Sequence, residues 1–322
     1  MTQSLAESVR AGDRRALARA ITLVESTRVD HRAEADALLD DLMPATGGAV
    51  RVGITGAPGA GKSTFIEALG VERTAAGEKL AVLAVDPSST RSGGSILGDK
   101  TRMERLAREP LAFIRPSPSS GTLGGVARRT REAMLVCEAA GCDVVLIETV
   151  GVGQSEVAVA GMVDVFVLLL APGAGDELQG VKRGIVELAD ILVVNKADGD
   201  LAAAAQRTAG DYASAVHIGR SRDESEAVVL TCSALTGEGI GAVWEAVAAR
   251  AEERRASGEQ TRRRAEQARA WMWSEVSDTL LEQFRADPRV ATEVEALEAD
   301  VTAGIVSPAA AARRLLQLAL EK

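Results

Sequence analysis

The sequence predicts an α/β fold in which a mostly parallel central sheet is flanked by helices on both faces. Short apolar, β-branched runs recur through the middle of the chain, and stretches with helical spacing separate most of them. The runs are continuously apolar, which indicates strands covered on both faces. Nearly every polar motif falls at the carboxyl end of such a run, where open α/β sheets bind their ligands.

The order of these runs suggests three regions. Residues 1–45 are expected to form an N-terminal helical arm, residues 46–250 a sheet-bearing domain, and residues 251–322 a C-terminal helical region. The expected strands are AVRVGITG (49–56), LAVLAVD (80–86), LAFIRP (111–116), DVVLIETVG (143–151), VDVFVLLLA (163–171), DILVVNKAD (190–198) and AVVLTCSA (227–234).

After about residue 240 the strand pattern stops. One long helix, or two in series, is expected, followed by a turn at RADPRV and two shorter helices. Ser307 and Pro308 are the expected N-cap and first position of the last helix. The basic run Arg262–Arg264 is interpreted as a solvated helix face, because Glu and Gln are interleaved with it.

Hydrophobic content, net charge and cysteine number argue against several classes of protein. The 322 residues are 46% hydrophobic, enough for a buried core, and the net charge of −9 argues against a nucleic-acid partner and against binding to an anionic membrane. The longest apolar run is too short to span a bilayer. Three unevenly spaced cysteines form no disulfide framework, which favours a reducing, cytoplasmic location. Both histidines, His31 and His217, lack neighbouring ligands in the sequence and are interpreted as non-catalytic.

A glycine-rich motif, GAPGAGKST, follows the first strand. It matches the P-loop pattern in the expected context of strand, turn and helix, whose backbone N–H groups cradle phosphates. Lys62 is expected to reach the β and γ phosphates, and the Ser63 hydroxyl to bind Mg²⁺. The predicted phosphate-binding residues are Gly56, Ala57, Pro58, Gly59, Ala60, Gly61, Lys62, Ser63 and Thr64.

The strand end VVNKADGD indicates which base is bound. Asn195, Lys196 and Asp198 fit the Asn-Lys-x-Asp element that reads guanine, in which the carboxylate accepts from N1–H and the exocyclic amine. Adenine offers no donor there, and a buried unpaired carboxylate costs about 1–3 kcal/mol or more. The loop TCSALTGEG supplies Ser233, Ala234 and Leu235, which resemble the segment that contacts guanine O6 through a backbone amide.

Three carboxylates, Asp86, Asp99 and Glu148, are candidates for the metal site together with Ser63. Mg²⁺ prefers hard oxygen ligands and keeps several waters, so carboxylates can hold it partly through its outer shell. Glu148 stands where phosphate-switching proteins usually have Asp, and its extra methylene would let it hold the ion or its water from further back. Gly151 is expected to offer its N–H to the γ phosphate.

The predicted catalytic set is Lys62, Asp99, Glu148 and Gly151. Gln154 is a candidate for positioning the attacking water, with an ordinary polar contact as the alternative. Three cations, Arg91, Arg102 and Lys182, are candidates for stabilising the transferring phosphoryl group, with purely structural roles as the alternative.

The long motifs VDPSST, GGSILGDKTRM, ETVGVGQSE and PGAGDELQGVKRGI, together with the P-loop and NKAD, closely resemble the MeaB family of P-loop GTPases, also described as ArgK-type transport kinases. The resemblance covers nearly the whole chain. It implies a P-loop NTPase fold, Mg²⁺-dependent hydrolysis of GTP to GDP, and a homodimer formed through the C-terminal helices. In that family the Glu of ETVG is the expected residue.

The resemblance also implies a partner, adenosylcobalamin-dependent methylmalonyl-CoA mutase, to which such proteins deliver the cofactor and which they protect. The implied mobile segments are Ser92–Lys100, the stretch after Gly151, and Gly173–Lys182, in which Asp176, Glu177, Gln179 and Lys182 match a segment that communicates with the mutase.

Three other interpretations stay open at this point. A nickel-type metal-insertion GTPase shares the P-loop and base motifs, but this chain lacks a His- or Cys-rich metal site. A kinase would need an acceptor pocket and a base aimed at it, and no sequence signature indicates either. A GTP-gated binding module without its own turnover is the third alternative.

Overall fold

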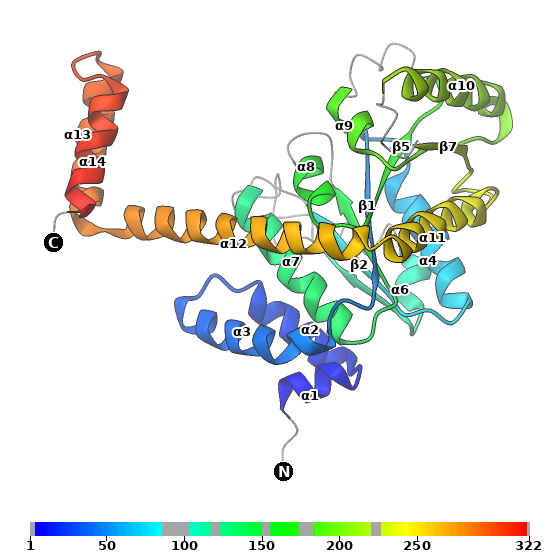
Figure 1. Cartoon of the computed structure of the whole chain (residues 1–322), viewed down its shortest axis with the longest axis horizontal. Helices are drawn as coiled ribbons and strands as arrows, with labels where there is room; N and C mark the ends of the chain where they lie inside the picture. The colour runs from blue at the N-terminus through cyan, green and yellow to red at the C-terminus, as the bar shows by residue number, and fades with distance from the viewer. Residues whose placement is uncertain are drawn as a thin grey trace. The chain divides into compact units, whose positions relative to one another are not determined.

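The computed structural model describes residues 4–85, 103–116, 123–149, 155–173, 183–219 and 227–320. Within them lies the predicted parallel sheet of seven strands, in the order β3-β2-β4-β1-β5-β6-β7 (Figure 1). The strands are β1 (Val50–Gly56), β2 (Leu80–Val85), β3 (Ala112–Arg115), β4 (Val144–Thr149), β5 (Val165–Leu170), β6 (Ile191–Val194) and β7 (Val228–Thr231).

All six strand pairings are parallel. From β1 the chain passes to β2 and β3 on one side, and β5, β6 and β7 lie on the other. The direction of winding therefore changes next to β1, and a doubly wound sheet binds ligands at the carboxyl ends of the strands near such a point. The P-loop follows β1 at that place.

Helices cover both faces of the sheet, as predicted. On one face α4 (Lys62–Ala75), α6 (Glu104–Arg108) and α11 (Ile240–Ala256) share a hydrophobic core with β1, to which Phe65, Leu106 and Val243 contribute buried side chains. The other helices packed on strands are α7 (Leu123–Ala139), α8 (Ser155–Ala160), α9 (Arg183–Leu188) and α10 (Ala202–Gly219). A short 3₁₀ turn, Gly199–Leu201, precedes α10.

Three helices precede the sheet: α1 (Leu5–Arg10), α2 (Arg14–Val24) and α3 (Val29–Leu42), followed by a 3₁₀ turn at Met43–Ala45. Ser4 and Glu7 form a reciprocal capping box at the start of α1, and the Asp13 side chain caps α2. All three helices pack against α7, where Arg32 pairs with Glu132.

The chain divides into two compact units, Met1–Gln267 and Ala268–Lys322. The second contains the greater part of α12 (Glu259–Ala286), then α13 (Pro288–Thr302) and α14 (Pro308–Leu320), which pack against each other. Ser307 Oγ accepts from the Ala310 N–H at 3.3 Å, as expected of an N-cap. The predicted region boundaries at residues 45 and 250 stay predictions.

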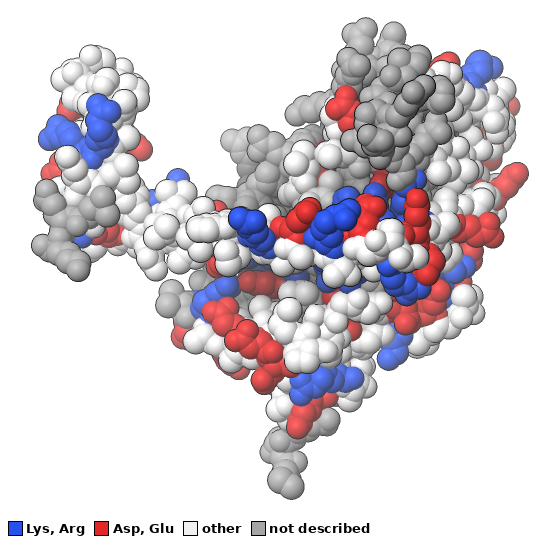
Figure 2. All heavy atoms as spheres, viewed as in Figure 1, with Lys and Arg blue, Asp and Glu red and all other residues white. Residues whose placement is uncertain are grey.

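After residue 240 the structure has two helices in series, which is one of the two predicted arrangements. Gly258 has φ +74° and separates α11 from α12. On the face shown in Figure 2, acidic and basic side chains are interspersed over these helices, consistent with the pairing of Arg255 with Glu252 and of Arg254 with Glu259. Among the described residues, no helix combines the length and apolarity that crossing a bilayer would require.

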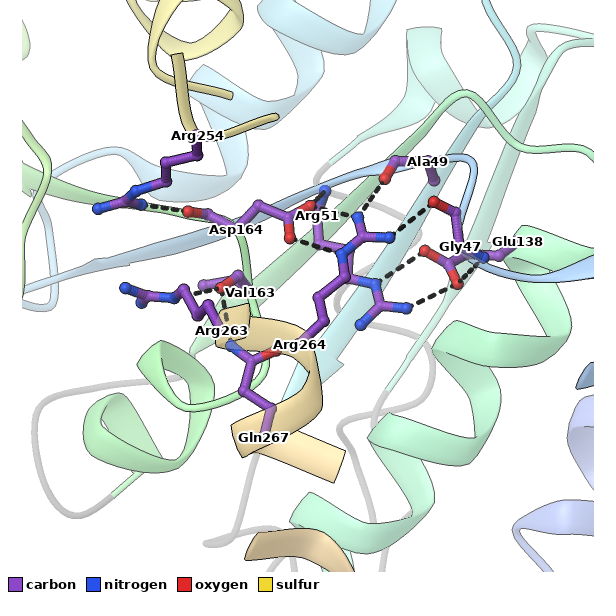
Figure 3. Close-up of polar contacts among 10 residues, drawn as sticks. All are labelled: Gly47, Ala49, Arg51, Glu138, Val163, Asp164, Arg254, Arg263, Arg264 and Gln267. Atoms are coloured by element: carbon purple, nitrogen blue, oxygen red, sulfur yellow. Dashed lines mark hydrogen bonds and ion pairs between the residues drawn. The ribbon is translucent and has the colours of Figure 1, made fainter. Parts of the chain in front are cut away.

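The interpretation of Arg262–Arg264 as a solvated face is wrong for two of its three residues. Arg262 is exposed. Arg264 donates to both carboxylate oxygens of Asp164 at 2.8 and 2.6 Å, and Arg263 donates to the Val163 carbonyl at 3.3 Å (Figure 3). These partners lie about one hundred residues away, at the amino end of β5, so the local charge pattern gives no sign of them.

Candidate nucleotide site

The P-loop lies between β1 and α4, as its motif predicts. Gly56 has φ +153° and Gly61 has φ +90°. A Cβ at Gly56 would lie 2.3 Å from the Leu169 carbonyl oxygen, and one at Gly61 would lie 2.5 Å from Asn195 Nδ2. Only glycine fits these two positions, which brings the loop backbone close to its neighbours and leaves the amino end of α4 open to an anion.

Lys62, the first residue of α4, is buried and turns back onto the loop. Its ammonium donates to the Gly56 carbonyl at 2.7 Å and to the Ala57 carbonyl at 3.3 Å. Burial lowers the pKa of Lys62 below its ordinary value, while the carboxylates of Glu148 and Glu156 act in the opposite direction. A cation held among carbonyls at the mouth of a P-loop can exchange these partners for phosphate oxygens.

Ser63 and Glu148 meet at the end of β4. The Ser63 hydroxyl donates to Glu148 Oε1 at 3.0 Å, and Glu148 is only 4% exposed. This places two hard oxygen donors side by side next to the P-loop, which is the donor chemistry that Mg²⁺ prefers. The pair therefore fits a magnesium ion with several waters, although within the described residues no group of three His, Cys, Asp or Glu side chains is placed to hold a metal.

Asn195 joins the P-loop to the loop after β7. Its Nδ2 donates to the Ala60 carbonyl at 2.9 Å, and its Oδ1 accepts from the Ala234 N–H at 3.0 Å. The Cys232 thiol also lies 3.6 Å from Oδ1, and burial raises the pKa of this thiol to about 12, so it stays neutral and acts as a weak donor. Asn195 thus fixes the spacing between the two segments predicted to bind phosphate and base.

Asp198 and Ser233 form a second link, which joins the loop after β6 to the loop after β7. The Ser233 hydroxyl donates to Asp198 Oδ2 and also accepts from the Thr236 N–H at 3.1 Å, which orients the carboxylate. Lys196 adopts φ +59°, unusual for a residue with a side chain, so the backbone turns sharply between Asn195 and Asp198. Leu235 is 82% exposed at the tip of the neighbouring loop.

The structure therefore brings together the predicted P-loop residues, Glu148, Asn195, Lys196, Asp198 and the loop Ser233–Leu235 at the carboxyl ends of β1, β4, β6 and β7. Several predicted residues lie outside the described residues: Asp86, Arg91, Asp99, Arg102, Gly151, Gln154, Asp176, Glu177, Gln179 and Lys182. Their roles stay predictions.

One buried charged residue, Glu156, is not singled out in the sequence analysis. Glu156 lies in the first turn of α8, is 0% exposed, and acts electrostatically on Lys62. The available signal was a carboxylate five residues after Gly151 in a stretch otherwise expected to be apolar and helical. His31, interpreted as non-catalytic, lies on α3 with its Nδ1 2.9 Å from Ser26 Oγ.

Comparison of the whole chain with known proteins gives one matching family model and several similar proteins. The sequence model of the family described as methylmalonyl Co-A mutase-associated GTPase MeaB matches residues 17–289. A mouse (Mus musculus) protein named methylmalonic aciduria type A homolog, mitochondrial, is 49% identical, over 95% of this chain and 76% of its own length.

GTPase ArgK of Escherichia coli is 51% identical, over 88% of this chain and 87% of its own. The crystal structure of an LAO/AO transport system kinase superposes with a TM-score of 0.77 at 40% identity, covering 98% of this chain and 97% of that one.

Proposed function

This chain belongs to the MeaB family of methylmalonyl Co-A mutase-associated GTPases, and from that membership we propose that it is a GTP-hydrolysing chaperone of an adenosylcobalamin-dependent methylmalonyl-CoA mutase. It is a GTPase with a P-loop fold, and it binds GTP and GDP. The family description and the name of the mouse relative support the association with a mutase. The proposal also includes two specific roles, delivery of the cofactor to the mutase and protection of the mutase.

The observation that carries the nucleotide assignment is the bridge made by Asn195, from the Ala60 carbonyl to the Ala234 amide. It holds the phosphate-binding loop and the predicted base-binding loop in one fixed arrangement. Asp198, oriented by the Ser233 hydroxyl, would accept from guanine N1–H and the exocyclic amine. A backbone N–H of the loop Ser233–Leu235 would donate a hydrogen bond to guanine O6.

At the phosphates, Lys62 would leave the Gly56 and Ala57 carbonyls for the β and γ phosphate oxygens. Ser63 and Glu148 would hold Mg²⁺ or its waters, with Asp86 and Asp99 as further ligands by sequence. The ion would neutralise charge on the phosphates as the bond to the γ phosphoryl group breaks. Gly151 would complete the site with its N–H.

Self-association through the second compact unit is a further part of the proposal. A helical unit without a large core of its own that exposes many apolar side chains is suited to pairing with another copy. The exposed large apolar residues of this unit are Met272, Trp273, Val276, Leu280, Leu281, Ile305 and Leu316. Sedimentation velocity should give the mass of a dimer, and a monomer at micromolar concentration would refute this part.

The test of the function is GTP turnover by the purified chain, alone and with a methylmalonyl-CoA mutase from the same source. We expect a rise of about ten-fold or more with the mutase, with GTP but not with ATP, because a partner can complete a GTPase site. Lys62→Ala, which should bind GTP more weakly, serves as the control. A turnover that the mutase leaves unchanged, despite measured GTP binding, would refute the chaperone assignment and leave the GTPase intact.

The solved relative named a transport system kinase raises phosphoryl transfer to an acceptor as the alternative. Release of one inorganic phosphate for each GTP consumed, in the absence of any added acceptor, is the outcome expected of hydrolysis. Phosphate release that requires an added acceptor would favour the kinase instead.

A further inference from the structure

We propose that Thr55 and Thr149 are positioning residues for the proposed magnesium site, and that they act by holding Glu148 at its distance from Ser63. The Thr149 hydroxyl donates to the Thr55 hydroxyl at 2.8 Å, and both residues are 0% exposed. These two side chains are called the hydroxyl pair below. The inference rests on the proposed binding of Mg²⁺ and nucleotide, and it adds two residues that touch neither.

The hydroxyl pair joins the strand that leads into the P-loop to the strand that carries Glu148. Thr55 lies in β1 and immediately precedes Gly56, the first glycine of the P-loop motif. Thr149 lies in β4 and immediately follows Glu148. The register of the two parallel strands extends to Ile54 opposite Glu148. Thr55 and Thr149 come one step further along, so their hydrogen bond continues the connection between the strands by one residue pair.

This connection lies between two halves of the sheet that hold different parts of the proposed site. On one side β1 pairs with β5, β5 with β6 and β6 with β7, and the segments after β1, β6 and β7 contain the predicted phosphate- and base-binding residues. On the other side β4, which carries Glu148, pairs with β2. The contact of Glu148 with Ser63 crosses from one half to the other. Its length therefore depends on how closely the carboxyl ends of β1 and β4 approach each other.

The hydroxyl pair lies on the face of the sheet opposite to Glu148. Successive side chains of a strand point to opposite faces, so Thr149 points away from the face that its neighbour Glu148 occupies. On β1, Thr55 shares its face with Gly53, where an added Cβ would lie 2.9 Å from Val159 Cγ1 of α8. The pair therefore acts on the proposed ligands through the backbone of the residues beside it.

A hydrogen bond brings two side chains closer together than an apolar contact does. The two hydroxyl oxygens are 2.8 Å apart, whereas two carbon atoms in contact lie about 3.5–4.0 Å apart. Valine has nearly the shape of threonine, so valine at both positions should move the strand ends apart by about 1 Å. Glu148 Oε1 and Ser63 Oγ are 3.0 Å apart, and a shift of this size is enough to take them beyond hydrogen-bonding distance.

Substitutions in the hydroxyl pair can separate positioning from stability. Thr149→Val alone leaves the Thr55 hydroxyl buried without this partner, which destabilises the fold. Thr55→Val/Thr149→Val removes both polar groups, and replacing both partners of a hydrogen bond with apolar groups of the same shape is nearly neutral for stability. The double variant should therefore keep the stability of wild type and lose its spacing.

The test measures three quantities: the urea midpoint of unfolding, the affinity for GDP in EDTA, and the affinity of the GDP complex for Mg²⁺, the last two by titration calorimetry. Wild type is compared with Thr149→Val, Thr55→Val/Thr149→Val, Thr149→Ser and Thr74→Val. Thr74 is the matched control because it is only 6% exposed and its hydroxyl donates to the Gly70 carbonyl at 2.9 Å. It lies in the last turn of α4, at the other end of that helix from the P-loop.

We expect the double variant to bind Mg²⁺ about five-fold or more weakly, with the urea midpoint of wild type and less than a two-fold change in affinity for GDP in EDTA. Five-fold corresponds to about 1 kcal/mol, the net contribution of one hydrogen bond such as that between Ser63 and Glu148. Thr149→Val should also bind Mg²⁺ more weakly, and it should unfold at a lower urea concentration. Thr149→Ser keeps the hydroxyl and should recover the affinity for Mg²⁺, and Thr74→Val should have the wild-type affinity.

A wild-type affinity for Mg²⁺ in the double variant would overturn the inference, as would an equal loss in Thr74→Val or a loss in Thr149→Ser as large as that in Thr149→Val. Equal losses for Mg²⁺ and for GDP in EDTA would also overturn it, because they would mean general damage to the site. A wild-type protein that binds no GDP would instead refute the proposed function, and a wild-type GDP complex that binds no Mg²⁺ would refute its metal site. The inference would fall with either.

Discussion

Replacing Asn195 with alanine should show how far the site depends on one buried amide. Asn195 is 1% exposed, donates to the Ala60 carbonyl at 2.9 Å and accepts from the Ala234 N–H at 3.0 Å. Alanine removes both bonds and leaves a carbonyl and an N–H without these partners at buried positions. An unsatisfied buried group costs about 1–3 kcal/mol, so the two together should lower the free energy of unfolding by about 2–6 kcal/mol.

Two measurements check this prediction. Urea denaturation followed by circular dichroism gives the free energy of unfolding, and calorimetry gives the affinity for GDP, which should fall by about ten-fold or more because the phosphate and base loops lose their common spacer. Gln206→Ala is the matched control, since this amide is exposed and, within the described residues, its side chain makes a single long hydrogen bond of 3.4 Å to Thr231. A loss of stability below about 0.5 kcal/mol for Asn195→Ala, equal to that of the control, would refute the reasoning.

Three further predictions concern the proposed ligands. Lys62→Ala should weaken GTP binding by about ten- to hundred-fold, because it removes a charged donor to the phosphates, and undiminished affinity in calorimetry would contradict the P-loop role. Asp198→Asn exchanges an acceptor for a donor and should shift preference from GTP to xanthosine triphosphate in a competition assay; unchanged selectivity for GTP would contradict the base assignment. Glu148→Ala should lower turnover by about ten-fold or more and raise the Mg²⁺ concentration needed, whereas a wild-type rate at wild-type Mg²⁺ would exclude Glu148 from the metal site.

Much of the fold could be predicted because its signals are local. All seven expected strands are present, since a strand covered on both faces must be apolar at successive positions, as VLLL in β5 and ILVV in β6 are. The P-loop could be predicted for the same reason. The positive φ angles at Gly59 and Gly61 favour glycine at positions that are close together in the sequence, so the motif is local. The side-by-side order β3-β2-β4-β1 has no such signature, because it depends on which apolar faces meet in space.

The long-range polar contacts could not be predicted. Asn195 is predicted as part of the guanine-binding element, which stays a prediction, and that motif gives no sign of the bond from its amide to the Ala60 carbonyl, 135 residues earlier. The local sequence predicts a solvated Arg264, whereas its partners Gly47 and Asp164 are 217 and 100 residues away. A charge or amide pattern reports only what is close in sequence, and a guanidinium with five donors can be satisfied by carbonyls that leave no pattern at all.

Two constraints explain why the residue at the end of β4 is a glutamate: the direction in which its side chain points, and the distance that this side chain must span to reach Ser63. Side chains alternate along a strand, and Val144 and Leu146 belong to the core that β4 shares with α4, so Glu148 points to the same face and arrives beside α4. There its Oε1 accepts from the Ser63 hydroxyl at 3.0 Å. An aspartate at this position would end about 1.5 Å shorter, one carbon–carbon bond, and would lose direct contact with the hydroxyl. Direction is set by the period of the strand and reach by the length of the side chain, so at this place in the sheet a glutamate is the carboxylate that meets the proposed magnesium ligand Ser63.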